Sequence, residues 1–176
     1  PSPVQCMPGI GLKYPNEGLI SFQPVVEWYS NYNLWYDGKA LPAEIENRTV
    51  STQNFYLTLP AMFTFEMKET GFFKIKHRIE VGGGPAVLLR FSNIAMGVKP
   101  DSPGFSGTAL SDKQRINVYM WGKARFLYMN LQSAWLFSYE TLQVGPAINV
   151  NFPIGSLIAG EGLNALVTSI SIKLVF

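Results

Sequence analysis

Apolar and polar residues alternate along most of this chain, so the pattern has a period of two residues. Between Tyr56 and Met67 the odd-numbered positions are apolar: Leu57, Leu59, Ala61, Phe63, Phe65 and Met67. The same alternation runs through 73–81 and 142–152 and returns in the last eight residues. Successive side chains of an extended strand point to opposite faces, so each segment predicts a β-strand. Helical spacing fits none of them.

Other segments predict strands from their β-branched and aromatic content, namely 4–14, 19–36, 84–98 and 115–137. In the last of these the apolar positions change phase after Tyr128, and we interpret the change as a β-bulge at 128–130. The whole pattern gives seven strands, and splitting 19–36 at 30–33 supplies an eighth. We find no helical segment of useful length and no linker. Residues 1–176 are therefore expected to form a single all-β domain.

The connections between these strands alternate in length. Short polar connections lie at 16–18, 68–71 and 139–141, whereas 37–48, 99–112 and 154–162 are longer. Strands that follow one another with short turns at one end and longer loops at the other are typical of an antiparallel, up-and-down barrel in an outer membrane. The longer loops 37–50 and 99–112 are the segments expected to make any specific contact outside the membrane.

The composition favours a barrel that is surrounded by lipid over one that is surrounded by water. Charged residues make up 15% of the chain and aromatic residues 14%, so there is little charge to cover a water-facing surface. In a membrane barrel the apolar face of each strand contacts lipid and the polar face lines the interior. Backbone groups cannot stay unpaired in lipid, so such a sheet has to close. Closure would also make the last strand structurally necessary.

The end of the chain carries a more specific signal. Ile170, Ile172, Leu174 and Phe176 occupy alternate positions, and the last of them is the final residue. This strand resembles the C-terminal assembly signal of bacterial outer-membrane β-barrel proteins. By length the chain is similar to their small eight-stranded group, which includes OmpX, the OmpA barrel and OmpW. The resemblance implies a transmembrane barrel of eight strands in the bacterial outer membrane, the lipid bilayer as surroundings, and the barrel-assembly machinery as a transient partner.

Charged residues on the polar strand faces are expected to lie inside this barrel. They are Glu27, Glu66, Lys74, Lys76, Arg78, Glu80, Arg90 and Arg125. Side chains fill the interior of a barrel of about eight strands, so these charges would have to pair with one another. A path that conducts solutes is the alternative within a barrel. In a soluble sheet the same residues would form the solvated face.

Aromatic residues near the strand ends are expected at the two membrane–water interfaces. They are Trp28, Tyr29, Trp35, Tyr36, Tyr119, Trp121, Trp135 and Tyr139. Trp and Tyr favour this position because each combines an apolar ring with a polar tip. The alternatives are ordinary core aromatics or a platform for sugars.

The sequence offers little that could carry catalysis or bind a cofactor. Its only cysteine is Cys6 and its only histidine is His77, which leaves no histidine pair and no cysteine cluster for a metal. Barrel deacylases of lipid A use a His–Ser pair, but His77 is followed by Arg78. The glycine-rich segment 82–91 lacks the ending of a phosphate-binding loop. A net charge of +2 does not favour a nucleic-acid partner.

We therefore expect a non-enzymatic outer-membrane protein without a cofactor. The functions that the resemblance implies are envelope integrity, surface contact, or the passage of small apolar molecules. The main alternative is a soluble β-barrel that binds an apolar ligand inside, as lipocalins do. A pilus or adhesin subunit that donates an edge strand is a third possibility, and a membrane lipase using His77 is a fourth.

Overall fold

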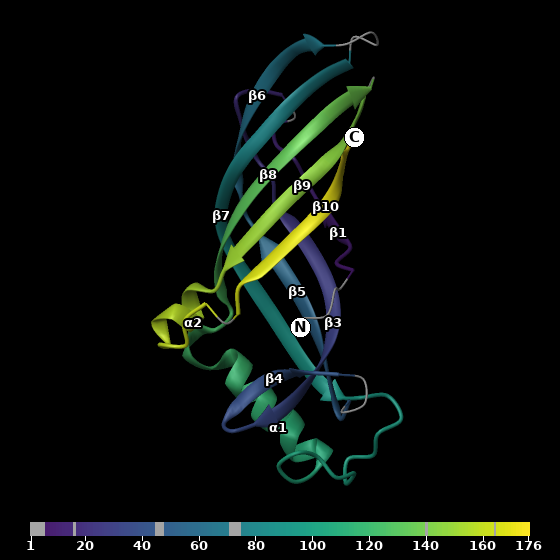
Figure 1. Cartoon of the computed structure of the whole chain (residues 1–176), viewed down its shortest axis with the longest axis vertical. Helices are drawn as coiled ribbons and strands as arrows, with labels where there is room; N and C mark the ends of the chain where they lie inside the picture. Colours follow the sequence, from purple (N-terminus) through teal and green to yellow (C-terminus); the bar gives the residue numbers. More distant parts are fainter. Residues whose placement is uncertain (1–5, 16, 45–47, 71–74, 140, 164) are drawn as a thin grey trace.

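The computed structural model describes residues 6–15, 17–44, 48–70, 75–139, 141–163 and 165–176. It contains one antiparallel sheet of ten strands that is curled into a half-barrel (Figure 1). The strands are β1 (Gly9–Gly11), β2 (Ile20–Phe22), β3 (Val25–Tyr36), β4 (Lys39–Ala43), β5 (Val50–Thr58), β6 (Ala61–Thr70), β7 (Ile75–Ile94), β8 (Leu127–Tyr139), β9 (Leu142–Phe152) and β10 (Val167–Val175). The expectation of an all-β antiparallel fold is thus confirmed, but the expected number of eight strands is wrong.

Several of these strands continue one another, so the sheet has seven rows. β2 and β3 form one row, and β5 and β6 form another. The pairing of β2 with β6 has the same register as the pairing of β3 with β5, so each row continues across the short gap between its two strands. The rows follow each other in chain order as β1, β2–β3, β5–β6, β7, β8, β9 and β10, each antiparallel to the next. β4 folds back on the end of β3. Among the described residues, β1 and β10 are the two edges, and they are not paired with each other.

The long strand β7 bends along its length (Figure 1), and its glycine-rich part lies opposite the junction of β5 and β6. Pro60 lies between the two strands, and Gly82, Gly83 and Gly84 lie across from it. A Cβ atom added to Gly84 would lie 2.2 Å from the carbonyl oxygen of Leu59, so only glycine allows the two backbones to approach this closely. The segment that resembled a phosphate-binding loop is therefore the bend of the half-barrel.

The helix α1 (Ala109–Trp121) corrects the expectation of a strand over 115–137. Thr108 caps its N-terminus: the Thr108 hydroxyl accepts a hydrogen bond from the backbone N–H of Ser111, and the backbone N–H of Thr108 donates in return to the Ser111 hydroxyl oxygen. The 3-10 helix η2 (Gly122–Ala124) follows, and β8 begins only at Leu127. The change of apolar phase after Tyr128 therefore has another cause than a bulge. It reflects the passage from a helix to a strand.

The longer connections gather at one end of the half-barrel. Figure 1 shows β4, α1 and α2 (Ile154–Ile158) at its lower end, while β6, β7, β8 and β9 extend to the upper end. Ile116 and Met120 of α1 pack against Val50 at the start of β5, with Trp35 beside them, so the helix closes this end with a small apolar cluster. None of the helices in the described part of the chain is long and apolar enough to cross a membrane.

The two faces of the sheet differ in polarity. On the convex, outer face the side chains are largely apolar and exposed; Phe65 is 53% exposed and Ile170 is 83% exposed. On the inner face many buried side chains are polar, such as Asn54 at 1% and Glu80 at 0% exposure. Apolar side chains are also buried inside, with Tyr56, Leu88 and Tyr128 in one cluster and Ala134, Leu136 and Ala147 in another. The alternation read from β5–β6, β9 and β10 therefore places apolar residues outside and polar residues inside.

Candidate functional site

A cavity of about 870 Å³ lies inside the lower half of the half-barrel. Its wall is built from β3, β5, β7 and β8 on the sheet side, from α1 and the turn after it below, and from the segment leading into β10. This volume falls within the range of sites that hold small molecules. The residues that line it are mostly polar on the sheet side and aliphatic around β4 and before β10.

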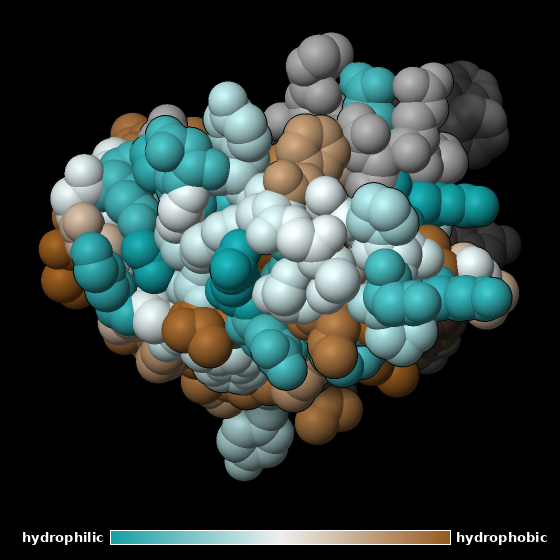
Figure 2. All heavy atoms as spheres, turned by 90° about the horizontal axis from the view of Figure 1, so that it is seen from below, coloured by the Kyte–Doolittle hydropathy of each residue, from teal (hydrophilic) through white to brown (hydrophobic). Residues whose placement is uncertain are grey.

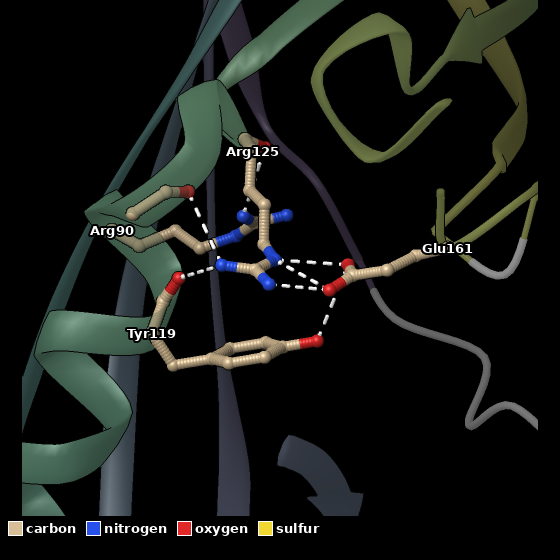
Figure 3. Close-up of polar contacts among 5 residues, drawn as sticks. Arg90, Tyr119, Arg125 and Glu161 are labelled. Carbon is tan, nitrogen blue, oxygen red and sulfur yellow. Dashed lines mark hydrogen bonds and ion pairs between the residues drawn. The ribbon is translucent and has the colours of Figure 1, made fainter. Parts of the chain in front are cut away.

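The floor of the cavity holds an ion pair between Arg125 and Glu161 (Figure 3). The Arg125 Nε donates to Glu161 Oε2 at 2.8 Å, and a second guanidinium nitrogen bonds the other carboxylate oxygen, so the contact is bidentate. Arg125 also donates to the backbone carbonyls of Tyr119 and Gly122 at 2.9 and 3.2 Å, which fixes the end of α1. The pair thus ties the turn after α1 to the segment before β10.

Tyr119 completes this group from the last turn of α1. Its ring lies under the Arg125 guanidinium, 3.9 Å from it, and its hydroxyl donates to Glu161 Oε2 at 3.3 Å. The hydrogen bonds from Arg125 hold the pKa of Glu161 below its ordinary value and raise the pKa of Arg125. Burial, reinforced by the Glu161 charge, raises the pKa of Tyr119. The three side chains therefore keep a carboxylate, a guanidinium and a neutral phenol together at neutral pH.

Arg90 of β7 lies next to this group but has a different set of partners. Its Nη2 donates to the Tyr128 hydroxyl at 2.7 Å, and its Nη1 donates to the Arg125 carbonyl at 3.3 Å. Its guanidinium also lies 5.8 Å from the centre of the Tyr128 ring. No carboxylate in the described part of the chain forms an ion pair with it. Arg90 is therefore a cation held in place by neutral groups.

A row of amides and hydroxyls covers the sheet wall beside Arg90. Asn33 donates to Thr52 at 2.8 Å, and the Thr52 hydroxyl lies 3.1 Å from that of Ser92. Asn54 and Asn33 both donate to the carboxamide oxygen of Asn31, at 2.9 and 3.3 Å. These residues come from β3, β5 and β7, whose inner faces meet here because the rows pair in this order. The wall is thus polar but uncharged.

A second charged group lies on the inner face farther up β7. Glu80 accepts hydrogen bonds from Lys13 at 2.7 Å and from Lys173 at 2.8 Å, and Gln23 donates to it at 3.1 Å. Lys173 also bonds the carboxamide oxygen of Gln23. Lys13 follows β1 and Lys173 belongs to β10, so the two edges of the half-barrel meet on a single buried carboxylate.

The structure brings together three of the eight charged residues that were expected inside, Arg90, Arg125 and Glu80, in the two groups described above. Arg125 lies in the turn after η2, outside any strand, so the strand expected there is wrong although the side chain is buried. Glu27 and Arg78 are half-buried on the inner side of β3 and β7, and Glu66 and Lys76 are exposed. Lys74 lies outside the described residues.

The aromatic residues expected at membrane interfaces divide between the two faces. Trp28 and Trp135 are exposed on the outer face, and Tyr36 and Trp121 are exposed near the lower end. Tyr29 and Tyr119 line the cavity and Trp35 packs against α1, so these three belong to the interior. Tyr139 ends β8, and its side chain lies outside the described residues.

The residues of the expected assembly signal form one face of β10. Ile170, Ile172, Leu174 and Phe176 are all exposed, and they point away from Lys173 and the interior. His77 lies on the outer side of β7, with its ring about 6 Å from those of Trp135 and Phe137. The described residues contain no group of three or more His, Cys, Asp or Glu side chains that could hold a metal ion.

Sequence reasoning missed the residues that complete the cavity: Asn31, Asn33, Asn54, Tyr128 and Glu161. The asparagines lie at alternate positions of β3 and β5, so their common face could have been read from the period of two. Glu161 lies in an irregular segment, 36 positions from its partner Arg125, and no local pattern links the two.

Comparison of this chain with protein-family models, with curated proteins and with solved structures finds no match.

Proposed function

We propose that this chain is a non-enzymatic β-barrel protein of the bacterial outer membrane, and that its convex face contacts lipid. The single observation that carries the proposal is the polarity of the two sheet faces. Large apolar side chains cover the outer face, including Phe63, Leu131 and Ile172, while Asn, Ser, Thr and a buried Glu face inward. A water-soluble sheet has the opposite arrangement, because burying apolar area is what stabilises it.

Closure of the sheet into a full barrel is part of the proposal. Unpaired backbone groups at β1 and β10 are unfavourable in hydrocarbon, so a membrane favours the closed form. The Lys13–Glu80–Lys173 group supports closure because it already holds both edges on the same carboxylate. A buried, shared ion pair of this kind gains strength in an interior shielded from water.

We assign the lower end of the barrel, with β4, α1 and α2, to the water side of the membrane. Figure 2 looks at this end and shows hydrophilic and intermediate residues across much of its middle, with hydrophobic residues mainly toward its margin. Exposed apolar side chains such as Phe105 and Ile158 give this end contact points for other envelope components. A soluble carrier of apolar ligands is less well supported, because the cavity wall is lined by Arg90, Asn31 and Asn54.

Two neighbouring arginine substitutions on β8 test the membrane proposal. Leu131 is exposed on the outer face and Gln132 faces inward. For a sheet in lipid, Leu131→Arg destabilises the folded protein by about 2–4 kcal/mol, since a charge near the bilayer midplane is unfavourable. In water the same change at an exposed position has almost no cost. The measurement is urea unfolding of protein folded into phosphatidylcholine vesicles and into detergent micelles.

The proposal also predicts how the unaltered protein partitions. It should fold into the vesicles, resist carbonate extraction and migrate differently on a gel before and after boiling. Gln132→Arg is the matched control, and it should fold into the vesicles as the unaltered protein does. A folded protein that stays in solution without detergent, with Leu131→Arg as stable as the parent, would contradict lipid contact at this face.

A further inference from the structure

The charges that line the interior cavity do not balance. The lining contains three basic side chains, Lys39, Arg90 and Arg125, and one acidic side chain, Glu161, which gives a net charge of +2. Glu161 is already engaged by Arg125 through a bidentate contact. Lys39 is exposed at the rim, so Arg90 is the cation inside the cavity that lacks a counter-charge among the described residues.

The partners of Arg90 fix its guanidinium but accept hydrogen bonds from only part of its N–H groups. A guanidinium has five N–H groups, and among the described residues two of them have acceptors, the Tyr128 hydroxyl and the Arg125 carbonyl. Figure 3 shows Arg90 bonded to the backbone carbonyl of Arg125, whereas Glu161 contacts the Arg125 guanidinium. The one carboxylate among the residues lining the cavity thus pairs with Arg125 and not with Arg90, so a second anion would balance the charge of Arg90.

The surroundings of Arg90 indicate which kind of anion fits. The NH2 group of Asn31 has no acceptor among the described residues, so it is available as a neutral donor on the cavity wall. Tyr29 supplies an aromatic surface from β3. The lining also includes aliphatic side chains, namely Leu41 and Pro42 of β4 and Leu166 before β10. The cavity thus offers a charged anchor together with aliphatic side chains for an apolar group.

We propose that this cavity binds a small organic carboxylate with a short apolar body. The carboxylate accepts hydrogen bonds from the Arg90 guanidinium, whose planar fork matches the two oxygens, and the apolar body lies against Leu41, Pro42 and Leu166. An interior of this kind selects amphipathic anions over the purely apolar molecules expected from the sequence. The site does not depend on the proposed membrane location, because its anchor Arg90 and the neighbouring Tyr29 and Asn31 line the cavity and are not exposed on the outer face.

Isothermal titration calorimetry of the detergent-solubilised, folded protein tests the site, with benzoate as the probe and benzamide as its neutral counterpart. We expect benzoate to bind about tenfold to a hundredfold more tightly than benzamide, as charge-assisted hydrogen bonds imply. Arg90→Met should abolish this preference. Arg78→Met is the matched control, because Arg78 lies on the same strand and the same face but does not line the cavity.

The comparison of the two probes on the unaltered protein keeps the proposal testable even if Arg90→Met fails to fold. Equal binding of benzoate and benzamide, no binding of benzoate at millimolar concentration, or equal affinity for sulfate would each overturn it. Full retention of benzoate binding by a folded Arg90→Met variant would do the same. Leu131→Arg distinguishes this site from the membrane proposal, because it alters the lipid-facing side and should leave benzoate binding in detergent unchanged.

Discussion

Asn117 of α1 pairs with the main chain of Ser92 in β7 through both ends of its carboxamide. The Asn117 oxygen accepts from the Ser92 N–H at 2.9 Å, and the Asn117 nitrogen donates to the Ser92 carbonyl at 3.3 Å. The pairing of β7 with β8 stops at Val87, opposite Leu127, so the last part of β7 has no strand on that side. A side chain of the helix thus takes the place of a strand and satisfies a backbone that would otherwise lack partners.

Asn117→Ala should destabilise the junction between α1 and the sheet. The change removes both hydrogen bonds to Ser92, and an unsatisfied buried backbone pair costs about 1–3 kcal/mol. Faster hydrogen exchange of the Ser92 amide would report the loss directly, and urea unfolding would give its size. Gln114→Ala, at an exposed position of the same helix, serves as the control. Unchanged exchange at Ser92 would show that the carboxamide does not hold this edge.

Glu80 should matter more for stability than either of its lysine partners. Glu80 is fully buried, so Glu80→Gln leaves Lys13 and Lys173 as two cations around a neutral amide, at a cost of about 3–5 kcal/mol. Lys173→Met leaves the Lys13–Glu80 pair intact and should cost less. The double variant Glu80→Gln/Lys173→Met should recover part of the stability that Glu80→Gln loses, because it removes one of the two unpaired cations. Urea unfolding of the four proteins checks this order, and a larger effect of Lys173→Met than of Glu80→Gln would contradict it.

The Arg125–Glu161 pair predicts a loss of stability in acid. The folded-state pKa of Glu161 lies below its ordinary value of 4.5 because Arg125 donates hydrogen bonds to the carboxylate. The contribution of Glu161 is therefore complete above about pH 4.5, and it disappears as the pH falls through the lower, folded-state pKa. Glu161→Gln should remove this part of the pH dependence. Glu17→Gln, at an exposed position, should retain it, and unfolding curves from pH 3 to 7 compare the three proteins.

Gly84→Ala should disturb the bend of the half-barrel. The new Cβ would lie 2.2 Å from the Leu59 carbonyl oxygen, so the backbone has to shift, and overpacking of this kind costs about 1–3 kcal/mol. Gly122→Ala is the control, since the nearest atom to its Cβ would be a guanidinium nitrogen of Arg125 at 3.4 Å. Comparable stability of the two variants would show that the bend does not require glycine.

The sheet could be predicted from the sequence because its polarity alternates with a period of two. The residues from Tyr56 to Met67 and those of β9 and β10 lie on the faces that the alternation assigns to them. The period identifies which residues share a face, but it does not by itself say which face is inside. The low charge of the chain led us to place the apolar face outside, and the exposure of Phe65 and Ile170 agrees with that placement.

The helix α1 could not be read from the same pattern. Its sequence contains Ile116, Val118, Tyr119 and Trp121, which are residue types with strong β propensity, and its polar and apolar residues are not separated cleanly. Thr108 followed by Ser111 was the local signal for a helix start that could have been used. The pairing of Arg125 with Glu161 depends on how α1 returns the chain to the sheet, so missing the helix also concealed the cavity floor.

The number of rows in the sheet determines whether its first and last rows would pair in parallel or antiparallel if the sheet closed. Because seven consecutive rows reverse direction at each step, the first and the last run the same way. If the backbone of Gly9–Gly11 were to bond directly to that of Val167–Val175, the two would meet in a parallel ladder with slanted, evenly spaced bonds. Every other neighbouring pair is antiparallel, so that seam would be the one place around the ring where the geometry changes.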